Sequence, residues 1–408
     1  MDKDRSFLNR HSLAGFGATF IGVGMGRFAY IALIPVLIQA GWFSDSEAAY
    51  LGAATLIGYI FGAPAASFLL RYFAAGQLIR LAMLIGSLSY LGCAFEQAPL
   101  GWFYLWRTLA GVSGAVLMVL APPEVLKSHD KAVKAKVSGV VFSGLGFGAM
   151  LSGTLVPALI DQSIQAAWLG LGGSCLLVTL FTWRSWDCTP SHQTSGIIQA
   201  SFKTLSQPQR YTLALIALAY GCNALGYLPH TLFWVDYIVR ELNHSFSQGG
   251  FYWSIFGIGA AIGPVLAGIC GDKFGVRNSL LLTYSLKAGA VALPLLSNQP
   301  VALFISSLMV GVLTPASVSL ISTYTLEAVG YELHTKAWAM VTLAFAVAQG
   351  GGGYAMAYYA SQLTSYAPLF MFGSVALAIS LLAIYLSVSP RHQPTSKLGN
   401  NKNEAISE

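Results

Sequence analysis

Charged side chains are scarce in this 408-residue sequence. Asp, Glu, Lys and Arg make up 9% of the residues, whereas a typical soluble domain contains about 25%. Hydrophobic residues account for 55%. A soluble globule of this length could not cover its surface with so few charges. The composition therefore excludes an ordinary soluble domain and indicates a chain embedded in a lipid bilayer.

Paired cysteines are also missing. The five cysteines are Cys93, Cys175, Cys188, Cys222 and Cys270. They are scattered along the chain without a C-x-x-C pair, so neither a metal site nor a disulfide framework is predicted. We expect the protein to work without a metal or a cofactor.

Motifs for nucleotide binding or catalysis are absent as well. The glycine runs at 144–148 and 350–353 follow no strand and lack the G-x-x-x-x-G-K-[ST] pattern of an ATP-binding loop. No H-E-x-x-H or G-x-S-x-G sequence occurs. We therefore expect neither an enzyme nor a nucleic-acid-binding protein. The glycine runs are interpreted as places where helices pack closely.

What the sequence does contain is long apolar runs. A bilayer core of about 30 Å requires about 20 apolar residues of α-helix. Twelve runs qualify, at roughly 13–40, 48–70, 79–95, 102–122, 137–159, 166–184, 211–237, 250–270, 279–296, 301–326, 337–360 and 367–388. They are continuous rather than alternating, which favours helices over β-barrel strands. The predicted fold class is an all-α membrane protein with twelve transmembrane helices.

The placement of Lys and Arg predicts the orientation. If the N-terminus lies inside, 18 of the 22 basic residues fall in inner segments, and Arg240 is the single one in an outer loop. The outer loops carry acidic residues such as Asp45 and Glu47 instead. We expect a multi-pass protein of a bacterial inner membrane, in contact with the lipid bilayer, with both termini in the cytoplasm.

A polar stretch divides the chain in two. Residues 185–209, rich in Ser, Thr, Gln and Pro, are expected to form a cytoplasmic linker. They separate an N-terminal six-helix bundle, 1–184, from a C-terminal six-helix bundle, 210–390, and the polar tail 391–408 is expected to be disordered. A shift of 200 residues superposes Pro64 on Pro264 and Gly111 on Gly311, as a parallel repeat would.

A short charged turn carries a family resemblance. It reads Gly268-Ile-Cys-Gly-Asp272-Lys273-Phe-Gly275-Val-Arg277, and glycines at 271 and 275 suit a tight reversal. The pattern G-x-x-x-D-[RK]-x-G-x-[RK] resembles the loop signature of the major facilitator superfamily of transporters. The resemblance implies two pseudo-symmetric six-helix bundles and an inner gate. In that gate Asp272 pairs with a loop arginine and faces the start of the fifth span. The corresponding first-half loop, 71–80, has no aspartate.

Two further segments extend the resemblance. Arg107-Thr-Leu-Ala-Gly111-Val-Ser-Gly114-Ala115 is similar to the superfamily's R-x-x-x-G-x-x-G-A motif, which implies an arginine facing a central cavity. Gly26-Arg27-Phe-Ala-Tyr30, together with His230-Thr-Leu-Phe-Trp-Val-Asp236-Tyr, is similar to the YbfB/YjiJ-like bacterial subgroup.

Each arginine within a span has an alternative explanation. Arg107 either faces the cavity or snorkels to the outer surface. Arg27 either supplies a fixed positive charge to the cavity or forms a buried ion pair with Asp236 or Glu47 that locks spans one and seven. Lys287, deep in the ninth span, is expected either to pair with a local partner or to contact another protomer.

The seventh span is unusually polar and aromatic. His230 either relays protons or makes a neutral hydrogen bond between helices, and Asp236 is either functional or merely solvated. The candidate substrate and proton cavity comprises Arg27, Tyr30, Arg107, Asn223, Tyr227, His230, Trp234, Asp236 and Gln349. The candidate gate comprises Gly268, Asp272, Lys273, Gly275 and Arg277.

These features predict a proton-coupled secondary transporter of a small organic solute, working by alternating access as a monomer. Arg27 and Arg107 favour anionic or zwitterionic cargo, and the direction of transport stays open. One alternative is a drug-type proton antiporter, although the fifth span lacks the G-P-x-x-G-G pattern of such exporters. Another is a transporter-shaped membrane receptor that binds its ligand without turnover.

Overall fold

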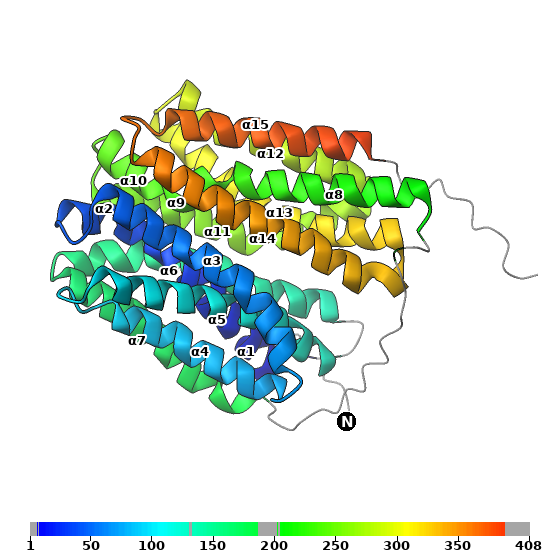
Figure 1. Ribbon diagram of the computed structural model, residues 1–408, viewed down its shortest axis with the longest axis horizontal. Helices are drawn as coiled ribbons and strands as arrows, with labels where there is room; N and C mark the ends of the chain where they lie inside the picture. Colours follow the sequence, from blue (N-terminus) through cyan, green and yellow to red (C-terminus); the bar gives the residue numbers. More distant parts are fainter. Residues whose placement is uncertain (1–5, 7, 130–132, 187–201, 203–204, 388–408) are drawn as a thin grey trace, which may run out of the picture.

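The structure, a computed structural model, describes residues 6, 8–129, 133–186, 202 and 205–387. All the regular elements in these residues are helices (Figure 1). Most of the expected linker, and the whole of the expected tail 391–408, lie outside the described residues.

The first half of the chain supplies six spans. The first is built from three consecutive segments: α1 (Arg10–Thr19), the π-helical η1 (Phe20–Ala29) and α2 (Tyr30–Gln39). The others are α3 (Asp45–Leu69), α4 (Ala75–Gly92), α5 (Leu100–Lys127), α6 (Lys134–Ile160) and α7 (Ile164–Thr182), the last followed by the short η2 (Trp183–Ser185).

The second half repeats this arrangement. Its first span is interrupted, and consists of α8 (Gln207–Gly226), α9 (Leu228–Leu232), α10 (Trp234–Asp236) and the π-helical η4 (Tyr237–Glu241). The others are α11 (Phe246–Phe274), α12 (Val276–Leu296), α13 (Pro300–Val329), α14 (Tyr331–Ala360) and α15 (Ala367–Leu386). Nine helices in the described residues are long and apolar enough to cross a membrane. The three other predicted spans are α4, the α8–η4 series and α14, so each of the twelve predicted runs is helical.

Glycine contacts show that the two halves are packed alike. In the first half, Gly111 of α5 lies so close to α3 that a Cβ there would collide with the carbonyl oxygen of Thr55. In the second half, a Cβ on Gly311 of α13 would collide with the carbonyl oxygen of Phe256 in α11. Equivalent helix pairs therefore touch at equivalent positions, which confirms the repeat.

This packing makes Gly111 sensitive to the smallest substitution. Gly111→Ala is expected to cost about 1–3 kcal/mol, because the added methyl group meets backbone that cannot move away cheaply. Gly101→Ala in the same helix is the control, since nothing lies within 4 Å of a Cβ there. We expect thermal unfolding in detergent to show a lower midpoint for the first variant and an unchanged or higher one for the second. Equal midpoints would contradict this account of the packing.

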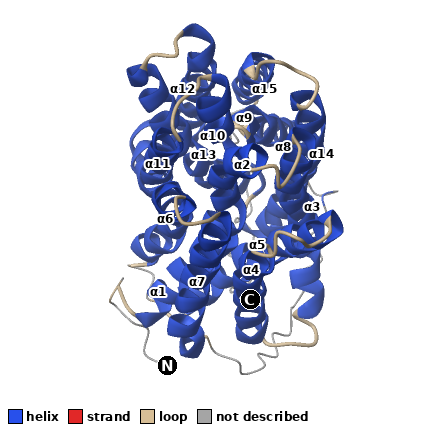
Figure 2. Ribbon diagram, turned by 90° about the vertical axis from the view of Figure 1, so that its left-hand side faces the viewer, coloured by secondary structure: helices blue, strands red, loops and turns tan. Residues whose placement is uncertain are grey.

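The two halves touch mainly along two helix pairs, α6 with α11 and α3 with α14. Viewed from the end near Asp45, α4, α5 and α7 lie in the lower part of the molecule and α12, α13 and α15 in the upper part (Figure 2). Gly146 and Gly153 of α6 pack against the backbone of α11, and Gly350 and Gly353 of α14 pack against isoleucine and leucine side chains of α3. The interpretation of the glycine runs as close-packing sites is thereby confirmed.

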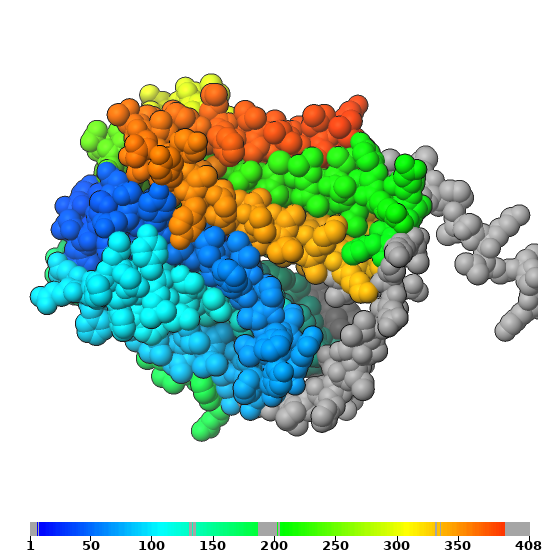
Figure 3. Space-filling model, in the orientation of Figure 1, coloured from blue at the N-terminus to red at the C-terminus, as the bar shows by residue number. Residues whose placement is uncertain are grey.

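On the side of α3 and α14, the halves separate towards one end. We call the end that holds Trp186 and Gln207 the linker end, and the opposite one the Asp45 end. Near the Asp45 end, the ring of Tyr50 in α3 stacks on that of Tyr354 in α14, with centroids 5.7 Å apart. The two helices diverge towards the linker end (Figure 1). In the space-filling view the surface is hollowed between them, with α6 visible behind (Figure 3).

The charged turn differs in part from its prediction. Gly275 has φ 81°, a conformation that favours glycine, and it separates α11 from α12. Asp272 and Lys273 lie in the last turn of α11 rather than in a loop, and Gly271 is helical. The reversal is therefore confirmed at Gly275 and wrong at Gly271.

Candidate functional site

Arg27 lies in the π-helical segment of the first span. Three glycines, Gly22, Gly24 and Gly26, make this segment thin, and a Cβ on Gly24 would lie 2.8 Å from the carbonyl oxygen of Gly144 in α6. Because one face of the segment packs closely against α6, the Arg27 side chain extends from another face towards the second half. There its Nη1 donates a hydrogen bond to Oε1 of Gln349 in α14, at 2.9 Å. π-Helical turns are common at functional sites because they offset side chains from the regular register.

Tyr227 lies opposite Arg27, where α8 gives way to α9. Its backbone, at φ −102° and ψ 1°, interrupts the helix. Nε2 of Gln349 donates to its hydroxyl oxygen at 2.6 Å, and the Arg27 guanidinium carbon lies 5.8 Å from its ring centroid. The numbers 27 and 227 differ by the 200-residue repeat, so the two interruptions occupy equivalent places. Interrupted helices at equivalent places in two repeats are typical of substrate sites in transporters.

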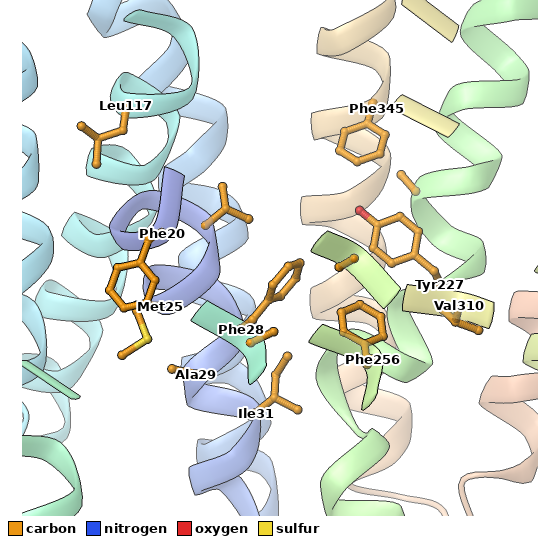
Figure 4. Close-up of a cluster of buried hydrophobic side chains, with 14 of the residues drawn as sticks. Phe20, Met25, Phe28, Ala29, Ile31, Leu117, Tyr227, Phe256, Val310 and Phe345 are labelled. Atoms are coloured by element: carbon orange, nitrogen blue, oxygen red, sulfur yellow. The ribbon is translucent and has the colours of Figure 1, made fainter. Parts of the chain in front are cut away.

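Hydrophobic rings surround this meeting point. Phe28 of η1 packs edge-on against Phe256 and Trp253 of α11, with centroids 5.7 and 5.9 Å apart. The close-up shows Phe28 directed from the first half towards Phe256, with Tyr227 and Phe345 on neighbouring helices (Figure 4). The polar groups of the site therefore lie in an apolar setting, where an electrostatic interaction is stronger than in water.

Lys287 reaches the same tyrosine from behind. Its Nζ lies 4.4 Å from the Tyr227 ring centroid and donates hydrogen bonds to Oδ1 of Asn223 (2.9 Å) and Oγ of Ser317 (3.5 Å). The side chain is fully buried. This local set of partners accounts for Lys287, so no contact with another protomer is needed.

The site carries positive charge without a nearby carboxylate partner. The salt bridges formed among the described residues involve Lys127 and Arg240, and none involves Arg27 or Lys287. Nε and Nη2 of Arg27 are buried without a hydrogen-bond partner in the described part of the chain, and so is Nδ2 of Asn223. Unpaired buried donors and uncompensated charge are costly, and an anion would satisfy both.

Arg107 belongs to a separate cluster inside the first half. Its side chain is 2% exposed, and Nη2 donates to Oγ1 of Thr55 at 2.9 Å. The rings of Tyr30 and Tyr90 flank the guanidinium, with centroids 4.3 and 5.7 Å from its carbon. The alternative that it snorkels to the outer surface is therefore wrong.

His230 and Trp234 form a third cluster, within the second half. Nε2 of His230 is 2.8 Å from Oγ of Ser306, and the imidazole stacks on Trp234 at 4.3 Å. Nε1 of Trp234 donates to Oγ of Ser307 at 2.9 Å. Both side chains are fully buried, so this cluster has the form of a hydrogen-bonded helix contact.

Asp236 lies near the Asp45 end, away from Arg27. Its side chain is 1% exposed, so the alternative that Asp236 is merely solvated is wrong. Its Oδ2 accepts hydrogen bonds from the Tyr366 hydroxyl and from Nη1 of Arg240 (3.3 Å). Nη1 of Arg240 also lies 2.5 Å from Oδ1 of Asp45, so the arginine joins the halves. The predicted ion pair of Arg27 with Asp236 or Glu47 is wrong too. Asp236 pairs with Arg240, and Glu47 accepts hydrogen bonds from Ser44 at the start of its own helix.

Sequence reasoning missed Arg240 and Tyr366 as members of this cluster. The available signal was the isolation of Arg240, the single basic residue in a predicted outer loop. The cluster is called the Asp45–Arg240 latch below, and consists of Asp45, Asp236, Arg240 and Tyr366.

The gate motif at the linker end is unpaired in this conformation. Asp272 is exposed and forms no salt bridge with any described residue. Nη2 of Arg277 donates instead to the carbonyl oxygen of Tyr385 at 2.7 Å, and Lys273 lies over the Phe274 ring. Gly268 is on an open face, where a Cβ would meet nothing within 4 Å.

An all-helical chain with two pseudo-symmetric six-span bundles and interrupted first and seventh spans has the fold of the major facilitator superfamily. The chain belongs to the family described as uncharacterised MFS-type transporter YbfB, whose profile matches residues 19–385. Comparison with curated protein sequences found no match.

Solved structures agree on the fold. A bacterial homologue of the human lysosomal transporter Spinster, in an inward-facing and unoccupied conformation, is similar with a TM-score of 0.71 at 15% identity. The match covers 92% of this chain and 97% of that one. The same homologue in an inward-facing and occupied conformation gives a TM-score of 0.68 at 15% identity, over 91% and 94% of the two chains.

Proposed function

We propose that this family member is a proton-coupled secondary transporter of a small organic anion, which binds between the halves at Arg27, Tyr227 and Gln349. The observation that carries the proposal is the half-buried Arg27 guanidinium. It faces the second half with two nitrogen atoms unpartnered and forms no salt bridge among the described residues. A planar guanidinium with free donors matches a carboxylate or a phosphate.

Alternating access accounts for the different states of the two ends. The Asp45 end is held by the latch, whereas α3 and α14 diverge at the linker end and Asp272 forms no salt bridge with the residues that the structure describes. With the linker end in the cytoplasm of a bacterial inner membrane, as the placement of Lys and Arg predicts, this is an inward-open state of a monomeric transporter. Pairing of Asp272 in the opposite state would then close the cytoplasmic side.

Asp236 is the proposed proton carrier. Within the part of the chain that the structure describes, it is the one buried carboxylate, and it contacts an arginine that bridges the halves. Protonation would remove its negative charge from that arginine and so link the proton to the opening of the Asp45 end. Arg107 and His230 lie in closed clusters, so we assign them supporting roles within their own halves.

The test is flux in proteoliposomes containing the purified full-length protein. Carboxylates, phosphate esters, zwitterions and cationic drugs are offered with and without an imposed pH gradient. We expect uptake of an organic anion that the gradient accelerates and that Asp236→Asn uncouples. Transport of cationic drugs alone would indicate an antiporter, and saturable binding without flux under any gradient would indicate a receptor.

A further inference from the structure

Lys287 has a property that the transport proposal does not use. It is a fully buried primary amine on α12, one helix behind the wall that faces the first half. Its partners are an amide oxygen, a hydroxyl and an aromatic ring, all of them neutral. A buried lysine without a carboxylate partner costs stability, so its presence inside a span calls for a role in function.

The geometry joins this charge to Arg27. Lys287 Nζ and the Arg27 guanidinium carbon lie 4.4 and 5.8 Å from the centroid of the same Tyr227 ring. The two basic groups therefore contact one aromatic ring, and when both are protonated they can act on one small ligand, because charges in a poorly solvated interior are screened little over short distances. Gln349, between Arg27 and the tyrosine hydroxyl, holds the ring in place.

An unpartnered donor lies beside the lysine. Nδ2 of Asn223 has no hydrogen-bond partner, although the residue is fully buried and its Oδ1 is taken by Lys287. The hydrogen bond from Lys287 orients the Asn223 amide, and its nitrogen remains as a donor available to a ligand. Hydrogen-bond donors therefore lie on both sides of Tyr227.

We propose that Lys287 carries a proton when a dianion occupies the site and thereby sets its charge preference, so that substrates with two negative charges bind more tightly than matched substrates with one. One anionic group pairs with the free guanidinium nitrogens of Arg27. The second lies towards Tyr227 and Asn223 and is stabilised by the lysine behind them. The inference rests on the proposed function, because it needs Arg27 to line the substrate site.

The test compares carbon-matched anions on the purified full-length protein. Butyrate with succinate, and hexanoate with adipate, are titrated while ligand-induced thermal stabilisation is measured. We expect the wild type to prefer the dianions, and Lys287→Met to lower that preference by on the order of tenfold while monoanion affinity changes little. Lys287→Arg keeps the charge and is expected to keep the preference. Lys127→Met, which removes an exposed charge, is the matched control.

The outcomes separate the two proposals. An unchanged preference in Lys287→Met, or an equal fall in both affinities, overturns the role of Lys287, since a purely structural residue would weaken all ligands alike. Equal affinities for monoanions and dianions in the wild type overturn it as well, while leaving an anion site at Arg27. Failure of the wild type to bind any of the anions, with binding of cationic solutes instead, overturns the proposed function and this inference together.

Discussion

Arg27→Met is expected to abolish transport while leaving the protein as stable as the wild type or more so. The substitution keeps a flexible apolar side chain of similar reach and removes a charge that forms no salt bridge with the described residues. Removing a buried, incompletely paired charge relieves its desolvation cost. Removing the group that pairs with the substrate costs roughly 2–5 kcal/mol of binding, which corresponds to about 30-fold or more in affinity.

The measurement pairs two readouts on the same preparations. Thermal unfolding in detergent gives the stability, and uptake of the best anion from the flux screen gives the activity. Arg10→Met, at the exposed start of the same span, controls for the loss of one positive charge and is expected to transport normally. Arg27→Lys keeps the charge but not the planar fork, so partial activity is expected. Wild-type uptake by Arg27→Met would remove this residue from the site.

The sequence was most informative where the signal is local. Twelve apolar runs, the reversal at Gly275 and the repeat visible at Gly111 and Gly311 each depend on hydropathy or backbone conformation within a short segment. Such features are set by the bilayer and by steric limits, whatever the rest of the chain does. They were enough to predict the fold.

The partners of the buried polar residues could not be predicted in the same way. Arg27 bonds to a glutamine 322 positions away, and Lys287 to an asparagine 64 positions away. The sequence indicated that these cations are unusual but offered several partners for each. It placed Tyr227 in a polar, aromatic helix, yet its position between two cations depends on a helix interruption and on the packing of α12 behind α8.

Arg240→Ala is expected to open the Asp45 end. The arginine joins Asp45 of α3 to Asp236 of the seventh span, and so bridges the two halves. Its loss leaves Asp45 unpaired and Asp236 with the Tyr366 hydroxyl as its remaining donor. The Asp45 side chain is 54% exposed, so solvent screens the pair that bridges the halves, and its loss is expected to shift the equilibrium by roughly 0.2–1 kcal/mol, or up to about fivefold.

Spin labels on two exposed residues at this end report the change directly. One label replaces Gln162 of the first half and the other replaces Thr364 of the second half. In double electron–electron resonance, Arg240→Ala should move population from the short to the long distance. Arg240→Lys keeps the positive charge between the two carboxylates and should largely keep the short distance. Asp161→Asn removes an exposed carboxylate near the end of α6 and should change nothing. If the short distance persists in Arg240→Ala, apolar packing between the halves holds this end closed without the latch.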